Sequence, residues 1–185
     1  MVSCVILAGG LGSRMGGTRA APVDKARLVR DGRPLLDTLL ERLGPQVDRI
    51  ALNANGDPAR WADTGLEVVP DTVPDRPGPL AGVLAGMDWA AAHGAPAVLS
   101  VAADCPAPPR DLAARLGAAG GLALAATGGR AEPTFGLWPV ALRGDLRAAL
   151  EGGTRKVTDW TGRHAAVLVD FPAGSFANVN RPEDL

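Results

Sequence analysis

The sequence predicts an α/β domain built on a mostly parallel sheet with helices on both faces. Two observations support this fold class. Short segments such as residues 2–8 and 97–101 are almost wholly apolar, which favours strands buried on both faces. These segments alternate with segments in which apolar residues recur at helical spacing, as in parallel βαβ units. A length of 185 residues fits one domain, so we expect a single domain over residues 1–185.

The apolar pattern also locates the elements. In the first half of the chain, strands are expected at residues 2–8, 49–53, 66–69 and 97–101. A helix is expected at 34–43, because its leucines share one face, Pro34 can begin it and Gly44 can end it. Another helix is expected at about 80–92. In the second half we expect helices at 109–116, 141–150 and 156–160, and strands at 122–126, 134–137 and 165–169.

Composition excludes several classes of function. The net charge is −1 and tyrosine is absent, so the chain offers neither the basic surface nor the aromatic platform of a nucleic-acid-binding protein. No apolar segment approaches the length of about 18 residues that spans a bilayer, and the N-terminus lacks the basic start of a signal peptide. The two cysteines, Cys4 and Cys105, cannot form a disulfide framework. We therefore expect a cytoplasmic protein that does not bind nucleic acid or membranes, and we expect a monomer.

Polar or flexible residues follow each strand of the first half. In a parallel sheet, ligands bind beyond the carboxyl ends of the strands, so these residues are the first candidates for a site. They are residues 9–14, residues 53–55, Asp71 and Asp104. The sequence thus predicts a ligand site along one edge of the sheet.

The densest signal is the glycine-rich stretch LAGGLGSRMGG at residues 7–17. Glycines let backbone N–H groups approach a phosphate, and Arg14 adds a planar cation that suits phosphate oxygens. The same residues could form a plain flexible loop with a solvated arginine. The P-loop pattern is absent, and the dinucleotide fingerprint fails at Met15 and at Asn53, where an acidic residue is expected. A dehydrogenase is therefore disfavoured.

Lys25, Asp71 and Asp104 are further candidates. Lys25, one of two lysines in the chain, follows the glycine-rich stretch and could reach phosphates, although most lysines are merely solvated. Asp104 ends a buried strand and could hold Mg²⁺, which usually takes one or two carboxylates together with substrate phosphates. It could also be a turn residue before proline. Asp71 lies in a Pro/Gly-rich segment that suits either a pocket wall or a simple turn. Cys105 is expected to pack, since no histidine is obviously near it.

Taken together, these motifs resemble a known family. LAGGLGSRMGG…DK, NAN, D…PGPLAG, ADCP and NVNRPEDL occur in this order in molybdenum cofactor guanylyltransferases, and the resemblance covers nearly the whole chain. The first motif alone indicates only the broad nucleotidyltransferase superfamily, whereas the later ones narrow it to the branch that handles molybdopterin. The resemblance implies a three-layer α/β/α, Rossmann-like nucleotidyltransferase fold. It also implies a nucleotide-binding half at about 1–105 and an acceptor-binding half at about 106–185.

The reaction implied by this resemblance is transfer of GMP from GTP to the terminal phosphate of molybdenum-loaded molybdopterin, with release of pyrophosphate. The catalytic residues would be Arg14, Lys25 and Asp104, with Asp104 binding Mg²⁺ or, alternatively, Mn²⁺. The implied GTP-binding residues are Leu7, Ala8, Gly9, Gly10, Lys25, Asn53, Asp71 and Asp104. Asn178 and Asn180 would face the pterin, and Glu132, Arg155 and Lys156 would lie near the acceptor or its phosphate. Proteins that handle molybdopterin, or molybdoenzymes that accept the product, are possible partners.

One feature departs from the family pattern. Six residues, Thr18–Val23, separate Gly17 from Asp24, where the family commonly has about one. Five extra residues should bulge outward if Lys25 is to keep its place, and Arg19 could share its role. Two alternatives stay open: a related nucleotidyltransferase that uses CTP or another phosphorylated acceptor, and a binding protein without catalysis. Cytidylyl relatives usually carry LAAG where this chain has LAGG, which favours GTP.

Overall fold

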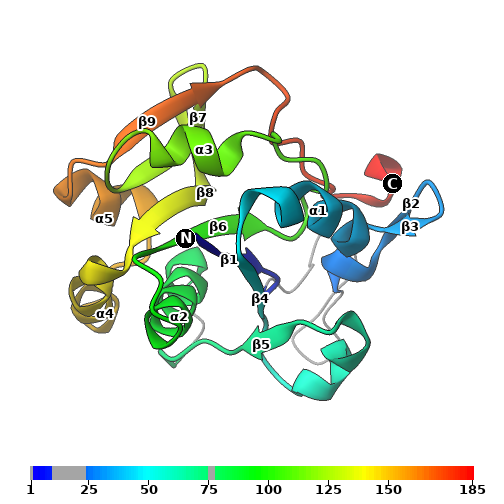
Figure 1. Ribbon diagram of the computed structural model, residues 1–185, viewed down its shortest axis with the longest axis horizontal. Helices are drawn as coiled ribbons and strands as arrows, with labels where there is room; N and C mark the ends of the chain where they lie inside the picture. The colour runs from blue at the N-terminus through cyan, green and yellow to red at the C-terminus, as the bar shows by residue number, and fades with distance from the viewer. Residues whose placement is uncertain (1, 10–23, 75–77) are drawn as a thin grey trace.

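The computed structural model describes residues 2–9, 24–74 and 78–185, and its centre is a seven-stranded sheet (Figure 1). The strands lie in the order β5, β4, β1, β6, β8, β7, β9. Among these strands, only β8 is antiparallel to its neighbours. The strands are β1 (Ser3–Leu7), β4 (Arg49–Asn53), β5 (Glu67–Val69), β6 (Ala97–Ala102), β7 (Ala123–Thr127), β8 (Arg130–Pro139) and β9 (Val167–Phe171). The predicted α/β class with a mostly parallel sheet is therefore confirmed.

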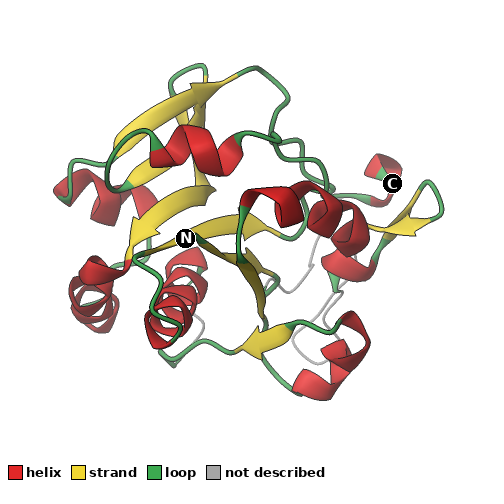
Figure 2. Ribbon diagram, in the orientation of Figure 1, coloured by secondary structure: helices red, strands yellow, loops and turns green. Residues whose placement is uncertain are grey.

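Helices cover both faces of the sheet (Figure 2). The helices are α1 (Leu35–Leu43), α2 (Pro79–Ala92), α3 (Leu112–Gly117), α4 (Arg143–Glu151) and α5 (Val157–Arg163). Leucines of α1 and α3 share one apolar core, and apolar residues of α2, α4 and α5 share the other. Side chains along β1 alternate between them, with Cys4 and Ile6 in the first core and Val5 in the second. No helix in the described part of the chain is long and apolar enough to cross a membrane.

Short 3₁₀ segments complete the structure. They are η2 (Lys25–Arg27), η3 (Gly44–Gln46), η4 (Pro58–Thr64), η5 (Val140–Leu142) and η6 (Pro182–Asp184). The segment η4 was not expected from the sequence. It begins with Asp57, whose carboxylate accepts a hydrogen bond from the N–H of Ala59, and it ends at Gly65 in the left-handed region.

The strands of the first half match the prediction within one residue, whereas two hairpins were missed. Asp31 and Gly32 have φ values of 53° and 77° and join β2 (Val29–Arg30) to β3 (Arg33–Pro34). Pro34 therefore ends a strand, and α1 begins one residue later than expected. Gly128 and Gly129 likewise have positive φ and connect β7 to β8. Two-residue turns of this kind favour tight antiparallel hairpins. Pairing therefore begins directly after the turn, and β8 is much longer than the predicted strand at 134–137.

Other boundaries shift for local reasons. α3 begins at Leu112 instead of residue 109, after a segment that contains Pro106, Pro108 and Pro109. The last strand begins at Val167 instead of residue 165, because Ala165 has a φ of 49° that an extended strand does not adopt.

The carboxyl ends of four neighbouring strands lie in one row. In the sheet register, Leu7 pairs with both Asn53 and Ala102, and Asn53 pairs with Val69. Each of these residues is the last of its strand. The segments that follow β1, β4, β5 and β6 therefore leave the sheet side by side, as the sequence predicted.

Candidate active site

Backbone hydrogen bonds hold the end of β1 between its two neighbours at this edge. The N–H of Ala8 donates to the carbonyl of Asn53 (2.9 Å), and the N–H of Ala103 donates to the carbonyl of Leu7 (3.1 Å). A Cβ added to Gly9 would lie 3.6 Å from Nδ2 of Asn55. Gly9 thus lies against the residues that follow β4, at the start of the glycine-rich stretch.

Asn53, Asn55 and Asp71 form one polar group at this edge, which we call the amide cluster. Nδ2 of Asn53 donates to Oδ1 of Asp71 (2.9 Å) and to the carbonyl of Val69 (3.0 Å). Nδ2 of Asn55 donates to Oδ2 of Asp71 (2.8 Å), and its Oδ1 accepts from the N–H of Asp71 (2.9 Å). Each carboxylate oxygen can accept more than one hydrogen bond. Asp71 is therefore fixed by two amides and keeps capacity to accept N–H groups from a ligand.

Close packing of α2 helps to hold Asn53. A Cβ added to Gly82 would lie 2.3 Å from Oδ1 of Asn53, and one added to Gly86 would lie 2.4 Å from Cγ1 of Val5. Only glycine permits this approach of the helix to the sheet. Asn53 is consequently buried, with 3% of its surface exposed.

Lys25, Asp104 and Asn180 form a second polar group, which we call the lysine cluster. Nζ of Lys25 donates to Oδ2 of Asp104 (2.8 Å) and to Oδ1 of Asn180 (3.0 Å). About four-fifths of the Lys25 and Asp104 side chains is buried, with 20% and 19% exposed. The cluster thus joins the residues after the glycine-rich stretch, the end of β6 and a segment close to the C-terminus.

The C-terminal segment is fastened at two points around Asn180. The N–H of Val179 donates to the carbonyl of Asp104 (2.7 Å). The carboxylate of Asp184 accepts hydrogen bonds from the N–H groups of Asn180 (2.8 Å) and Arg181 (2.9 Å). These two hydrogen bonds lower the pKa of Asp184 below its usual value. They hold the amide of Asn180 against Lys25.

The cysteine next to the site is not a nucleophile. Burial raises the pKa of Cys105 to about 12, and the nearby charges of Asp104 and Glu132 add to this effect. The thiol therefore stays protonated at neutral pH and packs in the core, as expected from the sequence. The histidines lie elsewhere: His93 contacts the carbonyl of Trp89, and His164 contacts Asp145.

The residues at this edge fit a metal ion that is shared with a substrate. No group of three or more His, Cys, Asp or Glu side chains suited to a metal occurs among the described residues. Mg²⁺ differs from zinc in that it needs only one or two carboxylates when substrate phosphates and water complete its shell. The partly exposed carboxylate of Asp104 can provide that single protein ligand.

Comparisons with known proteins decide the family. The model of the MobA-like NTP transferase domain matches residues 4–167. A molybdenum cofactor guanylyltransferase from Cereibacter sphaeroides is 52% identical to this chain, covering 98% of the chain and 92% of the relative. The chain belongs to this family. A second member, from a Bradyrhizobium strain, is 53% identical, covering 98% of the chain and 88% of the relative. The motif resemblance is thereby confirmed.

The fold is that of this family as well. A crystal structure of molybdopterin-guanine dinucleotide biosynthesis protein A from Archaeoglobus fulgidus aligns with a TM-score of 0.69. The alignment covers all of this chain and 94% of that one, at 21% identity. The predicted three-layer nucleotidyltransferase fold is confirmed.

The structure brings most of the predicted site residues to one edge of the sheet. Leu7 ends β1 and is followed by Ala8 and Gly9. Asn53 and Asp71 meet in the amide cluster, and Lys25, Asp104 and Asn180 meet in the lysine cluster. Asn178 is exposed and lies two residues before Asn180. Gly10, Arg14 and Arg19 lie outside the described residues. Arg155 donates to the carbonyls of Leu150 and Thr154, so its guanidinium is hydrogen-bonded at the end of α4.

Asn55 lies in the candidate stretch 53–55 but was given no binding role, although it holds Asp71 as firmly as Asn53 does. The N-x-N spacing at the end of a strand was the available signal. Residues two apart point the same way only while the backbone stays extended. The pattern of the sequence alone could not show that Asn55, beyond the end of β4, contacts Asp71 as Asn53 does.

Proposed function

We propose that this protein transfers GMP from GTP to the terminal phosphate of molybdenum-loaded molybdopterin, giving the guanine dinucleotide cofactor and pyrophosphate. The main support is that two different polar clusters share the edge where ligands bind in this fold class. One cluster offers a carboxylate to hydrogen-bond donors, and the other offers a cation and a metal-binding carboxylate. A nucleotide has both kinds of group, a base with N–H donors and a chain of phosphates.

In this proposal the amide cluster selects the base. Each oxygen of Asp71 accepts one amide hydrogen bond and can accept another, so the carboxylate can accept a pair of neighbouring N–H groups. Guanine presents such donors on one edge, its ring N–H and its exocyclic amino group, whereas cytosine presents only an amino group. This difference favours GTP over CTP. Leu7, Ala8, Gly9 and Gly10 would line the same site.

The lysine cluster would bind the phosphates. An oxygen of the acceptor phosphate attacks the α-phosphorus of GTP, the bond from that phosphorus to its bridging oxygen breaks, and pyrophosphate leaves. The acceptor phosphate is already an anion, so the step needs positioning and charge neutralisation more than a general base. Lys25 would exchange part of its contact with Asp104 for a phosphate oxygen, and Arg14 would support the same charge. A bound Mg²⁺ or Mn²⁺, held by Asp104, would neutralise the phosphates further.

The acceptor would approach from the second half of the chain. We propose that residues at about 1–105 bind the nucleotide and that residues at about 106–185 bind the acceptor, within a single domain over 1–185. Asn180 contacts Lys25, so in this proposal the segment with Asn178 and Asn180 would stand between the two substrates. Glu132, near the start of β8, would lie close to the acceptor. We expect the protein to act as a monomer, to receive molybdopterin from a protein that handles it and to pass the product to a molybdoenzyme.

The decisive experiment incubates the protein with molybdenum-loaded molybdopterin, Mg²⁺ and either GTP or CTP. We expect the guanine dinucleotide product and stoichiometric pyrophosphate with GTP, and much slower turnover with CTP. A preference for CTP would refute the guanylyl assignment. Turnover of GTP with a different phosphorylated acceptor alone would refute the assignment of the acceptor.

A further inference from the structure

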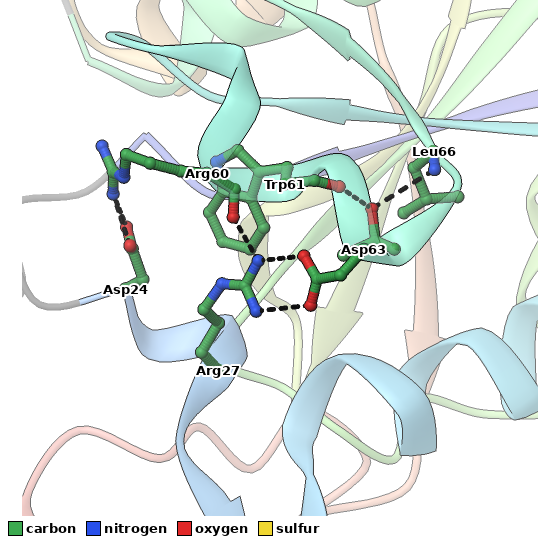
Figure 3. A network of polar contacts seen from close by, with 7 residues as sticks. Asp24, Arg27, Arg60, Trp61, Asp63 and Leu66 are labelled. Carbon is green, nitrogen blue, oxygen red and sulfur yellow. Dashed lines mark hydrogen bonds and ion pairs between the residues drawn. The ribbon is translucent and has the colours of Figure 1, made fainter.

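Four charged side chains tie the segment that carries Lys25 to η4 (Figure 3). Asp24 forms an ion pair with Arg60. Arg27 donates from both terminal nitrogens to the two carboxylate oxygens of Asp63, at 2.9 and 2.6 Å. Asp24, Arg27, Arg60 and Asp63 are called the clasp from here on. The two members of each pair are 36 residues apart, so the clasp joins separate parts of the chain.

Lys25 lies inside the clasp. Asp24 precedes it directly, Arg27 follows two residues later, and the N–H of Arg27 donates to the carbonyl of Asp24 (2.9 Å) to close one 3₁₀ turn. Ala26 is 1% exposed and faces the core. Because both ends of the turn are held and its middle is buried, the backbone of Lys25 has little freedom. Its ammonium group is thereby directed at Asp104 and Asn180.

The partner of this turn, η4, is firmly anchored. Trp61 is 1% exposed and belongs to the core under α1 and α3. The guanidinium carbon of Arg27 lies 4.7 Å from the centre of the Trp61 ring, and Arg27 also donates to the backbone carbonyl of Arg60. A single exposed ion pair contributes little to stability. A two-pronged arginine–carboxylate pair stacked on a buried tryptophan fixes a direction as well as a distance.

The clasp holds Lys25 from both sides of its 3₁₀ turn. We infer that the clasp is the device that positions Lys25, and that Arg60 and Asp63, which lie outside the motifs that carry the family resemblance, are positioning residues for the reaction. The inference rests on the proposed function only because that function gives Lys25 a phosphate to bind.

The first test measures the accessibility of Lys25 without any nucleotide. The chain has only two lysines, so limited acetylation followed by mass spectrometry reports on Lys25 with the exposed Lys156 as internal reference. We expect Arg60→Gln and Asp63→Asn each to raise the labelling rate of Lys25 relative to Lys156 by about fivefold, because the turn opens locally. Asp63 is exposed, so its variant should fold even where Arg60→Gln does not.

A matched control is available for this test. Arg33→Gln removes another exposed arginine–carboxylate pair, with Glu41 at 3.0 Å, outside the clasp. It should leave the labelling ratio unchanged. An unchanged ratio in Asp63→Asn would overturn the inference, and so would an equal rise in Arg33→Gln. Neither result depends on whether the protein transfers GMP.

The second test asks whether the clasp acts through Lys25. We expect Arg60→Gln to lower kcat/KM for GTP by about tenfold in the otherwise unchanged protein and to add no further loss in a Lys25→Ala background. Arg60→Lys, which keeps the charge, should restore part of the activity. A contribution to overall stability alone would lower kcat/KM equally in both backgrounds, and that outcome would contradict a positioning role.

Discussion

The two polar clusters at the edge of the sheet are assembled in different ways. The residues of the amide cluster come from one stretch of the chain, and their contacts with Asp71 span 16 and 18 positions. Those of the lysine cluster come from three stretches, and its contacts span 79 and 155 positions. The first cluster needs only β4 and β5 to pair, whereas the second needs the C-terminal segment to return across the molecule.

This difference indicates how each cluster responds to damage. The amide cluster is backed by the sheet register and by the close approach of α2, so it should tolerate distant changes. The lysine cluster depends on the clasp and on the fastening of residues 179–184, so changes outside it should matter more. Four substitutions test this contrast, and their expected effects decrease from Asp104→Ala to Asp184→Asn.

Asp104→Ala should remove the lysine cluster's function almost completely. The variant loses the proposed metal ligand and the partner of Lys25, so we expect pyrophosphate release to fall by at least about 100-fold. Circular dichroism should show an intact fold, since the side chain is partly exposed. Asp111→Ala, at an exposed carboxylate nearby in the chain, is the control. Near-normal release from Asp104→Ala would exclude Asp104 as a metal ligand.

Asp71→Asn should damage the amide cluster and leave the lysine cluster intact. The new amide nitrogen would face an amide donor of Asn53 or Asn55, and the charged acceptor would be lost. We expect KM for GTP to rise by about tenfold, with a smaller change in kcat. Steady-state kinetics with GTP and CTP measure the effect. If the preference for GTP over CTP stays the same, base selection must lie elsewhere.

Gly82→Ala should perturb the same cluster through packing. The added methyl group would meet Oδ1 of Asn53 and Cδ2 of Leu7, so either α2 or the asparagine must shift. We expect a loss of about 1–3 kcal/mol in the free energy of unfolding, together with a higher KM for GTP. Gly117→Ala, in α3, has nothing within 4 Å of the added methyl group and serves as the control in denaturant unfolding. If the two variants have equal free energies of unfolding, the helix α2 can move away from the sheet without loss of stability.

Asp184→Asn should have the smallest effect, with a size that depends on pH. The hydrogen bonds from Asn180 and Arg181 hold the pKa of Asp184 below its unfolded value of about 3.9. The carboxylate therefore stabilises the fold at pH values above 3.9, and this contribution is lost as pH falls through the folded pKa. We expect a slightly lower Tm for the variant at pH 7 and a shrinking difference in acid. A difference that grows in acid would contradict this account.

The contrast between the clusters also marks what could be predicted from the sequence. Asn53, Asp71 and Asp104 follow strands whose apolar pattern is unambiguous, so their common edge was predictable. The contact of Lys25 with Asn180 crosses 155 positions and follows no periodicity. The pairing of Arg60 with Asp24 has no signature either, because arginine and aspartate are common on any surface. The family resemblance could supply Asn180 as a site residue but not its partner.

Two short glycine-containing signals in the sequence indicate the hairpins that the apolar pattern does not show. Asp31-Gly32 and Gly128-Gly129 are typical of tight hairpins, and both form one. The second reverses β8 and explains why the sheet is mostly rather than wholly parallel. The strands near it were short and apolar, and such a pattern does not reveal direction.

The reversed strand has a consequence for how such an enzyme can change over time. Because β8 runs against β6, it brings its beginning, with Glu132, to the edge where the other strands end. That beginning follows a two-residue turn, in which an inserted residue would shift the register of the whole hairpin. The connections after the parallel strands are not closed by such a turn, so added residues there leave the register of the sheet unchanged. Natural or engineered variants should therefore gain new substrate contacts by lengthening the connections after parallel strands, while the β7–β8 hairpin keeps its length.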